Sequence, residues 1–381
     1  MGRGLTARPR RGNDAPPSRA PSLRRLLVED LRQADVRGTV RRDLRGLYFF
    51  YLDDEQRARL ARYGRVRRAL WMLGMLLRQL LARITPVRRL ILVVALVLAV
   101  QGGTDIVLGS VNISPDLRLY AFVLVLFVLM LELKDKLLAH DEIEVARQVQ
   151  RALLPRTAPP LDGWSIWLSS RPANDVGGDL VDALPLSGGR LGLALGDVSG
   201  KGMGAALLMA KLQATLRAVA TGGDDLGLLG ARLNGILHRD GIDNRFATLF
   251  YAELRPAAGE IRWLNAGHNP PLVLRAARPP AELGASAPPL GMLPGTVYGS
   301  DTVHLEPGDM VVIYSDGLTE ATNPREEEFG LERLRQLAPR LRSLAPDAAG
   351  ALILAEADAF LAGERAHDDL SLILLRRELE A

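Results

Sequence analysis

The pattern of apolar residues divides residues 156–378 into short strands and longer helices. Leu191, Leu193 and Leu195 alternate with smaller residues, which predicts a strand, and apolar residues in 205–219 recur at helical spacing. The strands follow one another like hairpins rather than in strict β-α-β alternation, which predicts an α+β fold with helices covering antiparallel sheet. Predicted strands cover 164–169, 190–197, 247–254, 261–265, 272–274, 310–314 and 370–375, and predicted helices cover 203–221, 225–238, 330–343 and 347–361.

Two uninterrupted apolar runs, 90–100 and 119–131, precede this domain. Each is shorter than the roughly 20 residues that span a bilayer, but both extend into weakly polar neighbours. Basic residues flank the pair on its outer sides, which by the positive-inside rule places both ends in the cytoplasm. The sequence therefore predicts a transmembrane hairpin over 90–133 in the inner (cytoplasmic) membrane, with the following domain cytoplasmic. The alternative is a buried helical hairpin of a soluble protein.

The remaining segments differ in composition. Residues 1–22 are rich in Arg, Pro and Gly and are expected to be a disordered basic tail, and 23–89 are expected to form an Arg-rich helical region. Within it, 69–84 fits either a helix at a bilayer surface or one buried in a small bundle. The sequence predicts a linker helix over 134–155, which Pro155 ends. Val145, Val149 and Leu153 lie on one face of this helix. That face is a candidate regulatory surface, which pairs with a second copy or packs on the domain 156–378.

Charge and composition exclude several classes of site and of function. The net charge of +4 over 381 residues hides an excess of 14 positive charges in 1–89 and of 10 negative charges in the remainder. The chain has no cysteine, which excludes disulfides, thiolate metal sites and a cysteine nucleophile. Aromatic residues make up only 5%, which argues against a base-stacking nucleic-acid platform.

Four aspartates lie in predicted turns, and three of them stand beside predicted strands. Asp197 lies in the glycine-rich turn 196–202 between a strand and a helix, and Asp179 follows two glycines. Asp316 precedes Gly317 at the end of a buried strand, and Asp368 directly precedes another. Oxygen ligands in such a set suit a hard cation such as Mg²⁺ or Mn²⁺. Two such ions favour hydrolysis of a phosphate ester, because they bind phosphoryl oxygens and lower the pKa of water.

The domain resembles the bacterial branch of the metal-dependent serine/threonine phosphatases of the PP2C class, the sporulation-phosphatase and stress-regulator type. The matching motifs are ARQVQRALLP at 146–155, VGGD at 176–179, GDVSGKG at 196–202, NAGHNP at 265–270, YSDGLTEA at 314–321 and HDDLS at 367–371. The resemblance implies an αββα sandwich, in which two antiparallel sheets have helices outside and the metals lie in a cleft at one end.

The resemblance also implies roles for single residues. Two Mn²⁺ or Mg²⁺ ions would be held by the catalytic set Asp179, Asp197, Asp316 and Asp368 together with the carbonyl of Val198. Asp369 would be a third-metal ligand or an anchor behind the ligands. From the residues alone, and not from the family's motifs, Arg171 and Lys201 are candidate contacts for the substrate phosphate, although Lys201 more simply fits a solvated turn. His268 is a general acid or, more simply, a hydrogen-bonded turn residue.

The resemblance implies a phosphorylated protein as substrate, an anti-sigma-factor antagonist in a partner-switching pathway. It further implies that the linker helix orders the active site when upstream regions dimerise, so a homodimer through 134–155 is expected. No nucleic-acid partner is expected. The alternative is a signalling scaffold whose phosphatase-like domain binds a partner protein without turnover.

Overall fold

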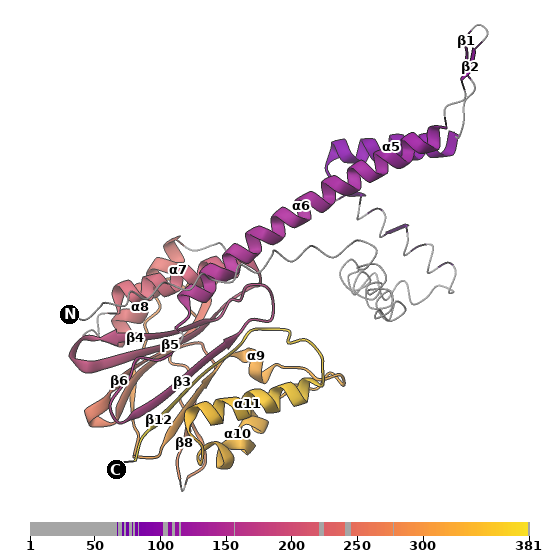
Figure 1. The fold of residues 1–381 in the computed structure, drawn as a ribbon. Coiled ribbons are helices and arrows are strands. Elements are labelled where there is room, and N and C mark those ends of the chain that lie inside the picture. Colours follow the sequence, from indigo (N-terminus) through magenta and orange to yellow (C-terminus); the bar gives the residue numbers. More distant parts are fainter. Residues whose placement is uncertain are drawn as a thin grey trace, which may run out of the picture. The chain divides into compact units, whose positions relative to one another are not determined.

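The computed structural model describes residues 84–379 except 102–105, 109–110, 114–115, 156, 221–224, 241–244 and 277, together with a few positions between 67 and 82 (Figure 1). The chain divides into two compact units, Met1–Leu133 and Lys134–Ala381. The predictions for 1–22 and for most of 23–89 lie outside the described residues.

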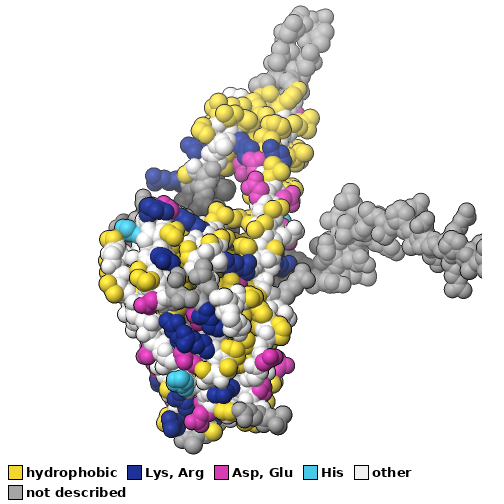
Figure 2. Space-filling view, turned by 90° about the vertical axis from the view of Figure 1, so that its left-hand side faces the viewer, with side chains coloured by type: hydrophobic (Ala, Val, Ile, Leu, Met, Phe, Trp, Pro, Cys, Tyr) yellow, Lys and Arg dark blue, Asp and Glu magenta, His cyan; other side chains and the backbone are white. Residues whose placement is uncertain are grey.

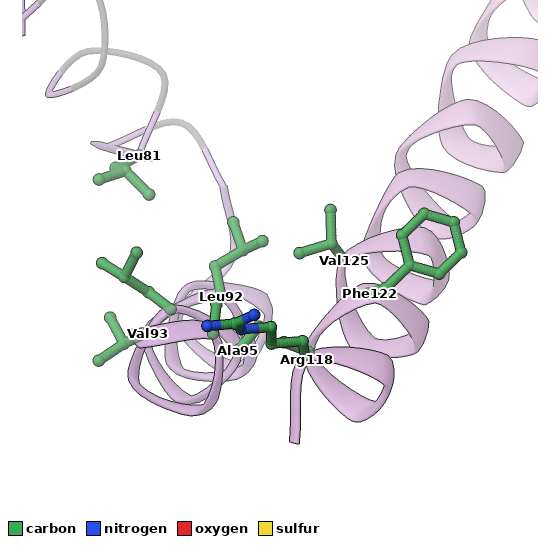
Figure 3. A pocket seen from close by; sticks show the side chains of 10 residues that line it. Leu81, Leu92, Val93, Ala95, Arg118, Phe122 and Val125 are labelled. Carbon is green, nitrogen blue, oxygen red and sulfur yellow. The ribbon is translucent and has the colours of Figure 1, made fainter. Parts of the chain in front are cut away.

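From residue 86 on, the described part of the first unit consists of helix, short β hairpin and helix. Helix α5 (Pro86–Gln101) is followed by strands β1 (Ile106–Leu108) and β2 (Val111–Ile113) and by the first half of α6 (Leu117–Leu153). An ion pair of 2.8 Å joins Arg88 of α5 to Glu132 of α6. Apolar side chains of both helices line a groove of about 570 Å³ (Figure 3). Many large apolar side chains of these helices are exposed, as the yellow surface in Figure 2 shows.

The predicted transmembrane hairpin is a point at which the structure differs from the sequence prediction. Among the described residues, no helix combines the length and the apolar character needed to cross a membrane. Helix α5 has 16 residues, and α6 has 37 but places Arg118, Glu132 and Lys134 around its apolar stretch. A span needs about 20 predominantly apolar residues. This finding overturns the prediction of two spans over 90–133 and of an inner-membrane location.

The second unit contains two five-stranded antiparallel sheets. The first sheet has the order β10-β7-β6-β5-β4, and the second has the order β3-β12-β11-β8-β9. The strands of the first sheet are β4 (Leu180–Leu186), β5 (Arg190–Val198), β6 (Ala247–Arg255), β7 (Glu260–Ala266) and β10 (Asp301–His304). Those of the second are β3 (Trp164–Arg171), β8 (Leu272–Leu274), β9 (Ala281–Glu282), β11 (Met310–Tyr314) and β12 (Leu370–Arg377).

Helices cover the outer faces of the two sheets. Helices α7 (Met203–Val219) and α8 (Leu226–Asp240) share an apolar core with the first sheet, and α10 (Gly330–Leu341) and α11 (Pro346–Leu361) share one with the second. A third core, which includes Leu193, Phe250 and Ile373, lies between the sheets. The α+β prediction is confirmed, and Figure 1 shows α10 and α11 beside the second sheet.

Strand β4 is the main element that the hydrophobic pattern did not predict. Its first five residues are all buried, so no alternation of apolar and polar positions marks it. It also contains Asp182 and Pro185, which argue against a strand in a sequence. The structure explains both: Asp182 is paired with Arg217 at 2.7 Å, and β4 is an edge strand, where proline is tolerated.

Candidate active site

Two neighbouring strands of the first sheet bring Asp179 and Asp197 together. In the antiparallel pair of β4 and β5, Leu180 lies opposite Gly196, so the residues just outside this pair, Asp179 and Asp197, are adjacent. A side chain on Gly178 would lie 3.2 Å from the Val198 carbonyl oxygen and 3.5 Å from an Asp197 carboxylate oxygen. Glycine at this position therefore lets the turn before β4 approach the end of β5 closely.

The second sheet contributes Asp316 and Asp368 in the same way. Strands β11 and β12 pair Tyr314 with Leu372, and the Ser315 amide donates to the Ser371 carbonyl at 3.0 Å. Asp316 begins the short helix α9 (Asp316–Thr319) directly beyond this pair. Asp368 lies two residues before β12 begins. One end of the sandwich thus collects aspartates from both sheets.

The pKa shifts show that these carboxylates act on one another. Burial raises the pKa of Asp179 well above its ordinary value, and the charge of Asp197 raises it further. Burial, then the charges of Asp316 and Asp368, raise the pKa of Asp197 to about 7. Burial and the charges of Glu320 and Asp368 raise the pKa of Asp316 to about 6. Repulsion across the two sheets means that these carboxylates share one site in which negative charge predominates.

The donor set fits a divalent cation in its chemistry. All four side chains offer carboxylate oxygens, and Asp179 has a buried oxygen, Oδ2, without a hydrogen-bond partner. A buried carboxylate oxygen of this kind normally has a partner, so a cation would satisfy it. In the described part of the chain, however, no group of three or more Asp, Glu, His or Cys side chains is arranged to hold a metal ion.

Lys201 lies within the carboxylate group, whereas Arg171 is engaged elsewhere. The Lys201 ammonium is 3.1 Å from an Asp368 oxygen and donates to the His367 carbonyl at 2.6 Å. Its charge also opposes the rise in the pKa of Asp316. Arg171, at the end of β3, forms an ion pair of 2.6 Å with Asp358 of α11. Of the two candidate phosphate contacts, only Lys201 is in contact with one of the four aspartates.

Asp369 joins the two sheets through backbone amides. Its Oδ1 accepts from the Ala173 amide at 2.7 Å, and its Oδ2 accepts from the Gly178 amide at 2.5 Å. Both oxygens are thus engaged in hydrogen bonds to the segment between β3 and β4. Burial raises the pKa of Asp369, and these amides oppose that rise. Of the two roles considered for Asp369, third-metal ligand or anchor, this geometry favours an anchor for the turn that carries Asp179.

His268 is buried just after β7, beside Thr248 of β6 and the backbone of Tyr314 of β11. Its Nδ1 lies 2.9 Å from the Thr248 hydroxyl oxygen. That oxygen also accepts a hydrogen bond of 3.2 Å from the Asp197 amide N–H. Burial lowers the pKa of His268 to about 4, so the ring is neutral near pH 7. Nothing in the sequence singled out Thr248, because its role depends on the pairing of β5 with β6.

The linker part of α6 contacts the Asp179 turn through Gln150. The buried Gln150 amide donates to the Gly177 carbonyl at 2.7 Å and accepts from the Gly177 amide at 3.0 Å. The predicted regulatory residues lie differently: Val145 and Val149 are exposed, and the Leu153 carbonyl accepts from Gln213 of α7 at 2.9 Å. A buried glutamine among exposed polar residues is not distinguishable by pattern, so only the structure identifies it.

Comparisons with known proteins agree with this architecture. The family described as Stage II sporulation protein E (SpoIIE) matches residues 187–378. Protein IcfG of Synechocystis sp. is 32% identical over 222 residues, which are 51% of this chain and 35% of that protein. Phosphoserine phosphatase RsbU of Bacillus subtilis is 30% identical over 246 residues, which are 63% of this chain and 71% of RsbU.

A solved structure gives the same result in three dimensions. The RsbU and RsbW domains of Rv1364c from Mycobacterium tuberculosis align with a TM-score of 0.51 and 27% identity, over 60% of this chain and 64% of that one. The chain spans about a third of IcfG and somewhat under two thirds of the Rv1364c chain. The resemblance drawn from the motifs is confirmed at the level of the family.

Proposed function

Since the chain belongs to the SpoIIE family and carries a PP2C-type phosphatase domain, we propose that it removes phosphate from phosphoserine or phosphothreonine in a protein. One observation carries the proposal. Four aspartates from two sheets converge at one end of the sandwich, and burial together with their negative charges raises the pKa values of Asp179, Asp197 and Asp316, as is typical of a functional site.

Two Mn²⁺ or Mg²⁺ ions are the proposed cofactors. Asp179, Asp197, Asp316 and Asp368 would hold them, with the Val198 carbonyl as a further ligand. When bound, the ions would supply positive charge to phosphoryl oxygens and lower the pKa of water. Asp369 would keep the Gly178 amide, and with it Asp179, in place. His268 and Thr248 would hold the Asp197 backbone from the opposite side.

Lys201 would exchange partners when substrate binds. In the structure its ammonium neutralises Asp368. Cations at the carboxylates would compete with this ion pair, and the freed ammonium would then be available to a phosphate. Arg171 would need to leave Asp358 to do the same, which makes it the weaker candidate.

The proposed substrate is a phosphorylated anti-sigma-factor antagonist. The names of the relatives support this choice, since RsbU is a phosphoserine phosphatase and the Rv1364c structure contains RsbU and RsbW domains. We further propose that the linker helix regulates the site. Gln150 connects it to Gly177, and the exposed Val145 and Val149 offer an apolar strip to the same helix of a second copy.

The test is hydrolysis of p-nitrophenyl phosphate and of a phosphoserine peptide by the full chain, with Mn²⁺, with Mg²⁺ and with chelator. We expect turnover only with metal, and its loss in Asp316→Ala. The matched control is Asp301→Asn, which alters an exposed carboxylate at the start of β10. Metal-independent turnover, or turnover that survives Asp316→Ala, would contradict the site. Folded protein without turnover under any condition would instead favour a scaffold that binds its partner.

A further inference from the structure

A second charged site lies between the segment after β8 and helix α10. A cavity of about 200 Å³ is lined by four arginines, Arg275, Arg278, Arg335 and Arg342, and by no acidic residue. Arg275 lies beside Asp309 at the start of β11, whereas Asp316 follows the end of that strand. Five residues of extended strand span about 17 Å. The cavity is therefore distinct from the carboxylate site.

The four arginines differ in whether a carboxylate balances their positive charge. Arg275 is 3.3 Å from Asp309, and Arg335 is paired with Glu282 and with Glu332. Arg342 and Arg278 have no carboxylate partner among the described residues.

Arg342 is the more constrained of the two uncompensated cations. It is half-buried, and its Nη1 donates to the carbonyls of Arg275 and Ala276. These bonds fix the guanidinium in position but do not neutralise it. A half-buried cation with no counter-ion is unfavourable, and an anion in the cavity would stabilise it.

We propose that this cavity binds the phosphate group of a small ligand. Guanidinium groups match phosphate oxygens with paired N–H donors, and the cavity is lined both by Arg278, from the loop after β8, and by Arg342, from the C-terminal end of α10. Pro279 and Pro280 also line it and give the ligand's carbon atoms an apolar contact. The volume suits a phosphate with a short carbon skeleton and is below the usual range for larger ligands. This site does not depend on the proposed phosphatase activity.

The test is calorimetric titration of the full chain with inorganic phosphate and with glycerol 3-phosphate at constant ionic strength. Chelator is present, so that the acidic end carries no metal and repels phosphate. We expect binding of one phosphate per chain, with tighter binding of glycerol 3-phosphate if the carbon skeleton contributes and equal binding if free phosphate is the ligand. Chloride at the same ionic strength gives no heat.

Substitutions of the lining arginines test whether phosphate binds in the cavity. Arg278→Gln and Arg342→Gln are expected to weaken binding by about tenfold each, the effect of one charge-assisted contact. Arg340→Gln is the matched control, because Arg340 lies on α10, is paired with Glu356 and does not line the cavity. If Arg342→Gln fails to fold, phosphate binding by Arg278→Gln tests the proposal alone, because Arg278 is exposed. Absent binding, or equal binding by Arg278→Gln and Arg340→Gln, would overturn the proposal.

Discussion

The two ends of strand β11 carry opposite excesses of charge, and they are built differently. At one end, aspartates fixed by strand pairing are largely buried, and this burial, followed by the repulsion of neighbouring carboxylates, raises the pKa of Asp197 to about 7. At the other, arginines reach a half-open cavity on long side chains, and two of them are paired with carboxylates. Burial increases the free energy of placing like charges close together, whereas water screens the repulsion between exposed charges. We therefore expect changes at the acidic end to have large effects and changes at the basic end to have small ones.

The largest effect is expected from Asp197→Asn. Loss of one carboxylate from the proposed cation site should remove several kcal/mol of transition-state stabilisation, or about 10³-fold in turnover. The measurement is hydrolysis of a phosphoserine peptide at saturating Mn²⁺, with Asp301→Asn as the control. Calorimetric titration with Mn²⁺ should show the same loss in binding. Retention of both properties would mean that the acidic end is not the cation site.

The same substitution should stabilise the metal-free protein at high pH. The folded state keeps a proton on Asp197 up to about pH 7, whereas the unfolded chain releases it near 3.8, so ionisation between these values favours unfolding. His268 acts in the opposite sense between about pH 4 and 6.5, but it is present in both proteins being compared.

Thermal unfolding in chelator measures this difference. At pH 5 we expect Asp197→Asn to be more stable than the parent chain by on the order of 1–2 kcal/mol, and at pH 8 by on the order of 4 kcal/mol. Added Mn²⁺ should stabilise only the parent chain. A gap that does not widen from pH 5 to pH 8 would mean that the carboxylates do not repel one another as inferred.

An intermediate effect is expected from Gln150→Leu in the linker helix. The change leaves the buried amide and carbonyl of Gly177 without partners, which costs about 1–3 kcal/mol for each unsatisfied group. The loosened turn should weaken Mn²⁺ binding through Asp179 and lower turnover. The control is the exposed neighbour Gln148→Leu. If both variants lose metal affinity alike, the contact with Gly177 is not the connection between helix and site.

The smallest effect is expected from Arg278→Gln at the basic end. Arg278 is exposed, so its loss should change the free energy of unfolding by less than about 0.5 kcal/mol. Turnover of the phosphoserine peptide should be unchanged in phosphate-free buffer. Denaturant unfolding and the peptide assay check both statements. A large loss of stability would show that the basic end is a structural cluster, and the contrast with the acidic end would then fail.

Much of the candidate site could be predicted because its residues occur in local patterns. Asp197 and Asp316 each follow an apolar strand, and Asp179 follows two glycines, so strand ends and turns are recognisable without any partner. Thr248 and Gln150 could not be predicted, because a threonine in a strand and a glutamine in a helix acquire their roles from segments far away in the chain. The prediction of a membrane hairpin failed because the short apolar runs had to be extended into polar neighbours to span a bilayer.

The sequence by itself determined most of the strands and the four long helices of the second unit, the four candidate aspartates and the family. These features depend on the periodicity and spacing of neighbouring residues, which local sterics and hydrophobic burial translate directly into structure. Only the tertiary structure decided which aspartates face one another, that Asp369 holds the Gly178 amide, and that Lys201 is paired with Asp368. It alone also brought Arg278 and Arg342 to one cavity. Such contacts join residues distant in sequence, so they depend on strand pairing and sheet packing rather than on any local pattern.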